Sequence, residues 1–312
     1  MAPLRIVFMG TPEFALPSLE ALRNGPQTVV AVVTRPDAPK GRGRHLSESP
    51  VKAAGLAAGL PVLQPYSLKD PGFLSALRVL LPDLLVVVAF KILPDEVLSI
   101  PSLGAVNLHA SLLPKYRGAA PIKWAIARGE TQTGITVFML NRIVDGGAVI
   151  RREALDIGPR ENAGELSARL SALGARVLCE SVDALACGEA RPELQDEGGA
   201  TPAPKLAKED GKIDFTRSAR EIYNWIRGMT PAPGAFTFLN GRRLQVLEAE
   251  LCEDESNGRP GTIASVGSNG LVVRTGAGKL AITAVKPENR KAMWVCDFLN
   301  GVRINENDAF DA

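Results

Sequence analysis

Short apolar runs alternate with longer amphipathic stretches over the first 110 residues. The runs are rich in valine, leucine and isoleucine and lie at 4–9, 29–34, 83–90 and 105–108. The stretches between them have the apolar spacing of helices and lie at 12–24, 51–59 and 71–81. Strands that alternate with helices predict a mostly parallel sheet covered on both faces. We therefore expect a doubly wound α/β fold in this part of the chain.

Two more apolar runs, 136–140 and 148–152, predict strands joined by a loop that contains Asp145 followed by two glycines, which permit a tight turn. Asn162 and Glu165 form a helix-start pattern, and helical spacing continues to residue 186. Residues 190–208 are polar, rich in proline, glycine and alanine, and without periodicity, which predicts a linker.

Beyond the linker the pattern changes to short strands. Ser218 and Glu221 form a capping box that opens a short helix. Five strand-like runs follow at 235–239, 244–247, 261–266, 271–274 and 280–285. Asn240-Gly241 is a strong hairpin signal, and five short strands favour a small β-barrel. We expect a first domain at 1–189, a linker at 190–208 and a second domain at 209–312.

Composition describes an ordinary globular protein that is large enough for two domains. The chain has 312 residues, of which 46% are hydrophobic and 22% charged. Its longest apolar run, 84–90, is far shorter than the roughly 20 residues that span a bilayer. No signal peptide pattern opens the sequence, so we expect a cytoplasmic protein without membrane contact. The four cysteines are widely spaced and predict no metal site.

Candidate chemistry lies at the end of the run 105–108. Asn107 and His109 are two apart, so in a strand their side chains project from the same face. Open α/β sheets bind ligands beyond the carboxyl ends of their strands, where this pair falls. An amide donor beside an imidazole can stabilise an oxyanion in acyl-type transfer, although such a pair alone is more often a loop hydrogen bond. The chain has only one other histidine, His45, which lies in a loop-like segment.

Charge is concentrated in one loop. The net charge of +2 is not that of a protein that coats nucleic acid. Between Thr34 and Arg44, however, four basic residues face a single acid, and nucleic-acid phosphates attract such clusters. A solvated surface loop is the alternative explanation. The basic residues are Arg35, Lys40, Arg42 and Arg44.

The run Asn-Leu-His-Ala-Ser-Leu-Leu-Pro-Lys-Tyr-Arg-Gly-Ala-Ala-Pro at 107–121 resembles the signature segment of the methionyl-tRNA formyltransferases, within the wider family that uses 10-formyltetrahydrofolate. Further similar segments occur in the family's order over nearly the whole chain. They lie at 8–15, 34–37, 41–44, 49–52, 144–147, 203–206 and 211–215.

The resemblance implies a Rossmann-like formyltransferase domain followed by an OB-like domain that assists tRNA binding. It implies transfer of a formyl group from 10-formyltetrahydrofolate, without a metal, to the α-amine of methionine on initiator methionyl-tRNA. The implied catalytic residues are Asn107, His109 and Asp145. The implied folate-binding residues are Ser111, Leu112, Leu113 and Pro114, with Phe90, and the basic loop would bind the tRNA. We expect a monomer.

Two departures from the family pattern border the expected folate pocket. The turn at Phe90-Lys91 is one residue shorter than usual and lacks a glycine. Ile143 stands where glycine is usual, and a β-branched residue fits poorly at positive φ, so we expect strain there. These departures leave a catalytically impaired folate- or tRNA-binding homologue as one alternative. The other is a formyltransferase for a small amine, which would share the three catalytic residues. The basic loop together with the barrel favours the tRNA enzyme.

The basic loop generates a first prediction. Arg42→Ala should weaken the binding of methionyl-tRNA and reduce its dependence on salt, because fewer counterions are released. Folate affinity should be nearly unchanged. Titrations of each ligand at several salt concentrations measure both quantities, and an equal loss of the two affinities would show that the loop supports the pocket without touching RNA.

Overall fold

The computed structural model describes residues 2–40, 45–252, 258–267 and 270–311. Its contacts divide the chain into two compact units. Unit 1 contains 1–118, 132–156 and 167–203, and unit 2 contains 119–131, 157–166 and 204–312. The domains that we expected from the sequence are continuous, whereas these units interleave at two short segments.

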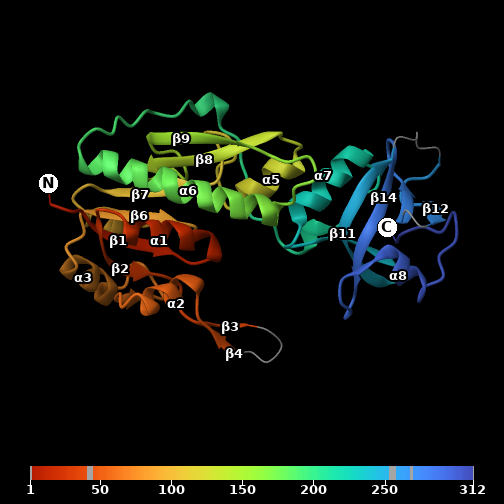
Figure 1. Cartoon of the computed structure of the whole chain (residues 1–312), viewed down its shortest axis with the longest axis horizontal. Helices are drawn as coiled ribbons and strands as arrows, with labels where there is room; N and C mark the ends of the chain where they lie inside the picture. Colours follow the sequence, from red (N-terminus) through yellow and green to blue (C-terminus); the bar gives the residue numbers. More distant parts are fainter. Residues whose placement is uncertain (1, 41–44, 253–257, 268–269, 312) are drawn as a thin grey trace. The chain divides into compact units, whose positions relative to one another are not determined.

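Unit 1 is built on a seven-stranded sheet with the order β5-β2-β1-β6-β7-β8-β9 (Figure 1). The first five strands in this order are parallel to one another. β8 runs antiparallel to both of its neighbours, β7 and β9. The prediction of a mostly parallel sheet is therefore confirmed. The strands are β1 (Arg5–Gly10), β2 (Thr28–Val33), β5 (Val62–Leu63), β6 (Leu84–Val88), β7 (Ala105–His109), β8 (Gln132–Met139) and β9 (Val149–Asp156).

Helices cover both faces of this sheet. Val7 and Met9 of β1 pack in one buried cluster with Phe73 and Leu77 of α3. On α2, a Cβ added to Gly55 would lie 2.6 Å from a methyl of Val32, so glycine lets this helix approach β2 closely. Because both faces are covered, β6 is a run of five buried apolar residues. The helices are α1 (Leu16–Asn24), α2 (Pro50–Ala57), α3 (Pro71–Val79), α4 (Asp95–Leu98) and α6 (Ala163–Ala186).

Local sequence signals explain where these helices begin. The side chains of Ser49 and Asp70 accept hydrogen bonds from backbone N–H groups three residues ahead, and a proline follows each of them. Asn162 and Glu165 cap the start of α6 reciprocally, as expected. A small hairpin that was not expected from the sequence, β3 (Ala38–Lys40) with β4 (His45–Ser47), pairs outside the main sheet.

Unit 2 contains an antiparallel sheet with the order β10-β11-β14-β13-β12, and β15 pairs with β14. Its five longer strands correspond to the five predicted runs. Asn240 and Gly241 both have positive φ, 53° and 71°, as the predicted hairpin turn requires. The elements are α5 (Pro121–Ala127), α7 (Ala219–Met229), β10 (Ala235–Leu239), β11 (Arg242–Cys252), β12 (Ile263–Gly267), β13 (Gly270–Arg274), β14 (Lys279–Pro287), β15 (Met293–Trp294) and α8 (Val295–Leu299).

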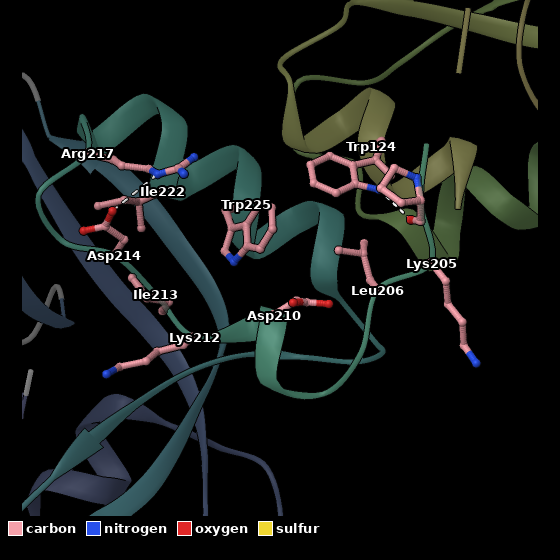
Figure 2. Close-up of a pocket in the computed structure, with 11 residues that line it drawn as sticks. Trp124, Lys205, Leu206, Asp210, Lys212, Ile213, Asp214, Arg217, Ile222 and Trp225 are labelled. Atoms are coloured by element: carbon pink, nitrogen blue, oxygen red, sulfur yellow. Dashed lines mark hydrogen bonds and ion pairs between the residues drawn. The ribbon is translucent and has the colours of Figure 1, made fainter. Parts of the chain in front are cut away.

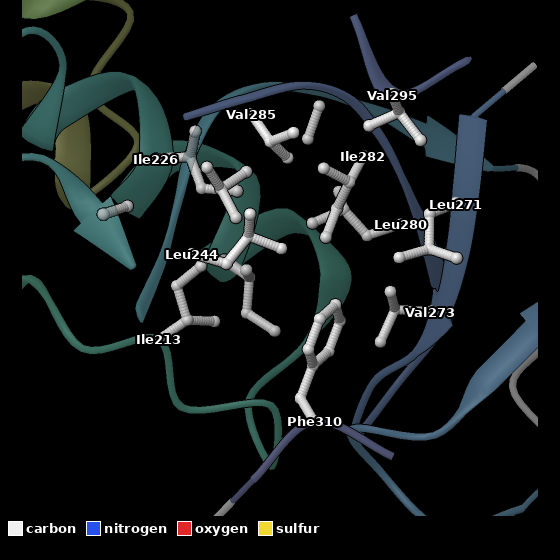
Figure 3. Close-up of a cluster of buried hydrophobic side chains, with 14 of the residues drawn as sticks. Ile213, Ile226, Leu244, Leu271, Val273, Leu280, Ile282, Val285, Val295 and Phe310 are labelled. Atoms are coloured by element: carbon white, nitrogen blue, oxygen red, sulfur yellow. The ribbon is translucent and has the colours of Figure 1, made fainter. Parts of the chain in front are cut away.

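The last residues of the chain connect the two outer strands of this sheet. Single bridges join Phe238 to Asp311 and Thr262 to Ala309, so the tail contacts both β10 and the start of β12. Inside the curved sheet lies an apolar core formed by strands and by the buried face of α7 (Figure 3). Its members include Ile226, Leu244, Leu271, Ile282 and Phe310.

The capping box of α7 generates a stability prediction for unit 2. Ser218 Oγ accepts from the backbone N–H of Glu221, and the Glu221 carboxylate accepts from the N–H of Ser218 at 3.0 Å. Ser218→Ala should destabilise unit 2 by about 1 kcal/mol, whereas Ser218→Thr, which keeps the hydroxyl that also donates to Glu221, should retain most of the stability. All three tryptophans, Trp124, Trp225 and Trp294, lie in unit 2, so urea unfolding followed by tryptophan fluorescence reports this unit. Equal loss in both variants would contradict the capping role.

Candidate active site

Strand β7 carries the first two candidate residues in the middle of the unit 1 sheet. Asn107 lies between Val87 of β6 and Phe138 of β8 and is half-buried. His109, two residues on, is 6% exposed. The two side chains belong to the same face of the strand, as the spacing predicts.

A cavity of about 90 Å³ lies over this part of the sheet. One wall is formed by β6 and β7, a second by residues 90–93 after β6, and a third by residues 140–145 after β8. The lining is mostly apolar, with a few polar groups. Three predicted site residues line it together: Phe90, Asn107 and Asp145.

His109 is held behind this cavity by its ring nitrogens. Nε2 lies 2.8 Å from the carbonyl oxygen of Tyr116, and because a carbonyl only accepts, Nε2 must donate. The other nitrogen, Nδ1, lies 3.7 Å from Oδ2 of Asp145. That distance is longer than a direct hydrogen bond and within the range of an ion pair. Nδ1 is therefore the nitrogen that remains for proton exchange.

Asp145 reaches the imidazole because its loop makes an unusual turn. The backbone N–H of Gly146 donates to the carbonyl of Ile143 at 3.1 Å, and Asp145 has a φ of 52°. A positive φ at the third position is what a type II turn requires. Asp145 Oδ2 also accepts from the backbone N–H of Gly118 at 2.8 Å. This bond joins the loop after β8 to the loop after β7.

Glycine is required two residues after Asp145. A Cβ added to Gly147 would lie 1.6 Å from the carbonyl oxygen of Met139, so no other residue fits without moving the backbone. The tight turn predicted from the glycine pair is present, closed by the hydrogen bond from Gly146 to Ile143.

The expected strain at Ile143 is wrong. Ile143 does not have positive φ, and its side chain is 55% exposed beside the cavity. Positive φ occurs instead at Asp145 and at Ala89, whose φ is 49°. Ala89 belongs to the shortened turn after β6, where a non-glycine residue in this conformation costs on the order of 1–3 kcal/mol.

The segment Ser111–Pro114 is placed differently from our expectation. Ser111 is fully buried and Leu113 is 2% exposed, and no residue of the segment lines the cavity. Thr136 Oγ1 donates to the carbonyl of Ser111 and accepts from the N–H of Leu113. The carbonyl of Ser111 and the N–H of Leu113 are therefore already paired within the protein. Only Leu112 and Pro114 are partly exposed.

Residues 193–203, which we expected to lie in a linker, are hydrogen-bonded to the rest of unit 1. Glu193 and Val149 exchange backbone hydrogen bonds of 2.8 and 2.7 Å. Gln195 Nε2 donates to the carbonyls of Asp145 and Gly147, both at 2.8 Å. The sequence offered no signal for these contacts, since the segment has no apolar periodicity.

The basic loop is only partly described. The side chain of Lys40 and all of Arg42 and Arg44 lie outside the described residues. Arg35 donates to the carbonyl of Pro36. The single acid of the loop, Asp37, is paired with Lys52 Nζ at 2.5 Å, and hydrogen bonds from Lys52 and Gln64 lower the pKa of Asp37. Lys52 therefore compensates the one negative charge of this loop.

A larger cavity, of about 380 Å³, lies in unit 2 (Figure 2). Trp124 and Trp225 pack edge to face there, with ring centres 5.9 Å apart, and Trp124 Nε1 donates to the carbonyl of Pro204. None of the predicted site residues lines it. It also lacks an amide–imidazole–carboxylate set, so the smaller cavity of unit 1 remains the candidate active site.

Other classes of site find little support among the described residues. They contain no group of three or more side chains that could hold a metal ion. Burial raises the pKa of the Cys179 thiol to about 11, which disfavours a thiolate nucleophile there. The described part of the chain has no helix with the length and apolar character needed to cross a membrane.

Comparison with known proteins gives matches along most of the chain. Residues 4–182 match the formyl transferase family, and residues 205–303 match the formyl transferase C-terminal domain. The chain is 46% identical over 302 residues to a methionyl-tRNA formyltransferase of Desulfotalea psychrophila, covering 96% of this chain and 94% of that protein. It is 47% identical over 306 residues to that of Syntrophus aciditrophicus, covering 98% of each.

Solved structures share the fold at low identity. HypX from Aquifex aeolicus, in complex with tetrahydrofolic acid, superposes with a TM-score of 0.62 at 17% identity. The match covers 99% of this chain and 51% of that chain.

An ion pair near the site generates a pH prediction. Arg117 donates to both carboxylate oxygens of Glu197 at 2.8 Å, and this hydrogen bonding lowers the pKa of Glu197. The folded state therefore gains stability above the ordinary pKa of about 4.3 for glutamate, and loses it as pH falls through the lowered value. Glu197→Gln should lower the melting temperature of the protein at pH 7, and this difference from the parent should shrink as pH falls through the lowered pKa of Glu197.

The control is Glu189→Gln, which changes an exposed carboxylate in the same unit. Calorimetry at low ionic strength measures both variants. A difference between Glu197→Gln and the parent that stays constant as the pH is lowered would contradict the ion-pair explanation.

Proposed function

The chain belongs to the formyl transferase family, and we propose that Asn107, His109 and Asp145 carry out its reaction, the formylation of initiator methionyl-tRNA. One observation supports these roles above the others. Asn107 and Asp145 line the same cavity, and His109 Nδ1 lies 3.7 Å from the Asp145 carboxylate. An amide and a carboxylate therefore face one reacting group, and the imidazole lies behind that carboxylate.

The proposed formyl donor is 10-formyltetrahydrofolate, part of which would occupy the cavity of unit 1. The lining fits a flat heterocycle, because apolar side chains form the walls and a few polar groups remain to orient it. At about 90 Å³ the cavity suits only the part of the molecule that carries the formyl group. Three exposed apolar side chains beside it offer contacts to the remainder: Ile92, Ile143 and Val144.

Asn107 would stabilise the charge that develops on the formyl oxygen. Its side-chain amide can donate a hydrogen bond from a strand whose backbone is paired on both sides, so little reorganisation would be needed as the charge forms. Removing one such donor typically reduces the rate by about 10²- to 10³-fold. This donor is neutral, so it acts at any pH at which the protein is folded.

His109 and Asp145 would handle the proton. The α-amine of an aminoacyl group must be neutral to attack, and its ordinary pKa near 8 leaves a usable neutral fraction at pH 7. Attack forms the new C–N bond, and the amine proton must then reach N10 of the folate as the old C–N bond breaks. Asp145 Oδ1 makes no hydrogen bond with the described residues, and His109 Nδ1 faces the same carboxylate, so these atoms can pass the proton.

Contacts with the tRNA are proposed for the basic loop of unit 1 and for the antiparallel sheet of unit 2. The loop keeps its positive charge because Lys52 neutralises Asp37. We further propose that the protein acts as a monomer in the cytoplasm. A formyltransferase for a small amine gains no support, because the relatives that match both units are named for methionyl-tRNA.

Loss of the imidazole provides the direct test. His109→Ala should reduce formyl transfer by at least about 100-fold, the usual scale for an acid–base group. The variant should still fold, because β7 is held by strands on both sides. Turnover with methionyl-tRNA and formylfolate is measured together with the melting temperature. His45→Ala, assayed at saturating tRNA, is the control for the other histidine, and near-parental turnover in His109→Ala would overturn the assignment.

A further inference from the structure

Gln195 contacts both loops that surround His109. Its Nε2 donates to the carbonyls of Asp145 and Gly147, and its Oε1 accepts from Arg117 Nη2, all at 2.8 Å. We propose that Gln195 is a positioning residue that holds the Asp145 carboxylate in its reactive place. This inference rests on the proposed function, in which Asp145 handles the proton.

The amide of Gln195 matches the turn that it contacts. The turn at 143–146 places Asp145 at a φ of 52°, a conformation that needs support from its surroundings. The two N–H donors of one amide group bind two carbonyls of this loop, so both donors are used. A glutamate of the same length would present no proton to these carbonyls near neutral pH.

Arg117 fixes the orientation of that amide. Because a guanidinium only donates, the group facing Arg117 Nη2 must be the carbonyl oxygen of Gln195. Arg117 is held in turn by two hydrogen bonds to Glu197. The Arg117 guanidinium thus prevents Gln195 from turning its N–H donors away from the Asp145 loop.

The contact between Gln195 and Arg117 also links the groups that bind His109 Nε2 and Asp145 Oδ2. Arg117 lies between Tyr116, whose carbonyl accepts from His109 Nε2, and Gly118, whose N–H donates to Asp145 Oδ2. The backbone N–H groups of Tyr116 and Arg117 both donate to Thr201, at 2.9 and 2.8 Å. The segment that carries Gln195 is therefore anchored to the loop after β7 as well as to the loop after β8.

Gln195 itself does not line the cavity, so it would act through Asp145 and not on the substrates. Its loss should reduce kcat and leave the affinity for both substrates nearly unchanged. A misplacement of about 1 Å can cost up to about 100-fold in rate. We expect Gln195→Met, which keeps the length but removes all three hydrogen bonds, to lower kcat by about 10- to 100-fold, with each KM within about twofold of the parental value.

The matched control is Gln132→Met, the same change in the same unit. Gln132 is exposed and donates to Asp156 at the far end of the β8–β9 pair. It should keep the parental kcat. If Gln195→Met also keeps the parental kcat, or loses activity only through a higher KM, the positioning role is overturned.

Gln195→Glu separates the effect of the contact with Arg117 from the effect of the two hydrogen bonds to the carbonyls of Asp145 and Gly147. It keeps an acceptor for Arg117 but has no donor for the carbonyls of Asp145 and Gly147. It also serves if Gln195→Met fails to fold, because it preserves the charge-assisted contact with Arg117. A kcat as low as that of Gln195→Met supports the proposal, whereas a parental kcat shows that only Arg117 matters and overturns it.

A double-mutant cycle tests whether Gln195 acts through Asp145. In an Asp145→Asn background, Gln195→Met should cause no further loss of kcat. Losses that multiply would show an independent structural effect and overturn the proposal. A parental kcat for Asp145→Asn alone would overturn the proposed role of Asp145 as well. A slow Asp145→Asn variant together with a fast Gln195→Met variant would overturn the positioning role only.

Discussion

The candidate site depends on one hydrogen bond between two loops, from the backbone N–H of Gly118 to the carboxylate of Asp145. This bond joins the loop after β8, which carries the acid, to the loop after β7, whose Tyr116 carbonyl accepts from the imidazole. β8 runs antiparallel to β7, so its last residue, Met139, pairs opposite Val106, near the start of β7. The loop must therefore fold back along the sheet before Asp145 can reach His109.

Residues with positive φ are concentrated in the loops around the cavity, where the chain must turn sharply. Seven described non-glycine residues have positive φ, and three of them, Ala89, Tyr116 and Asp145, belong to the loops around Asn107 and His109. Each costs on the order of 1–3 kcal/mol and persists only where surrounding contacts enforce it. At Asp145 and Tyr116 these contacts are visible, because Gln195 binds the first backbone and Thr201 the second. The free energy of this strain is offset by hydrogen bonds from a single segment, 193–203.

The sequence predicts what depends on local patterns. Apolar periodicity identified the strands of both units, and the spacing of Asn107 and His109 placed them on one face. Prediction from the sequence failed where the structure depends on hydrogen bonds between residues that are far apart in the chain. Gln195 lies 50 residues from Asp145 and 78 from Arg117, and such hydrogen bonds leave no periodic trace. Likewise, nothing near Ser111 indicates that Thr136, 25 residues away, would bind and bury its backbone.

The buried imidazole restricts how a proton can move. Nε2 of His109 is committed to the carbonyl of Tyr116, a group that cannot give a proton back. Only Nδ1 can then change its protonation during a reaction, and the nearest acid to it is Asp145. Asp145 Oδ2 is occupied by Gly118, which leaves Oδ1 as the oxygen with unused acceptor capacity among the described contacts. The geometry thus selects one nitrogen and one oxygen, and their relative position is set by loops that the backbone of 193–203 ties together.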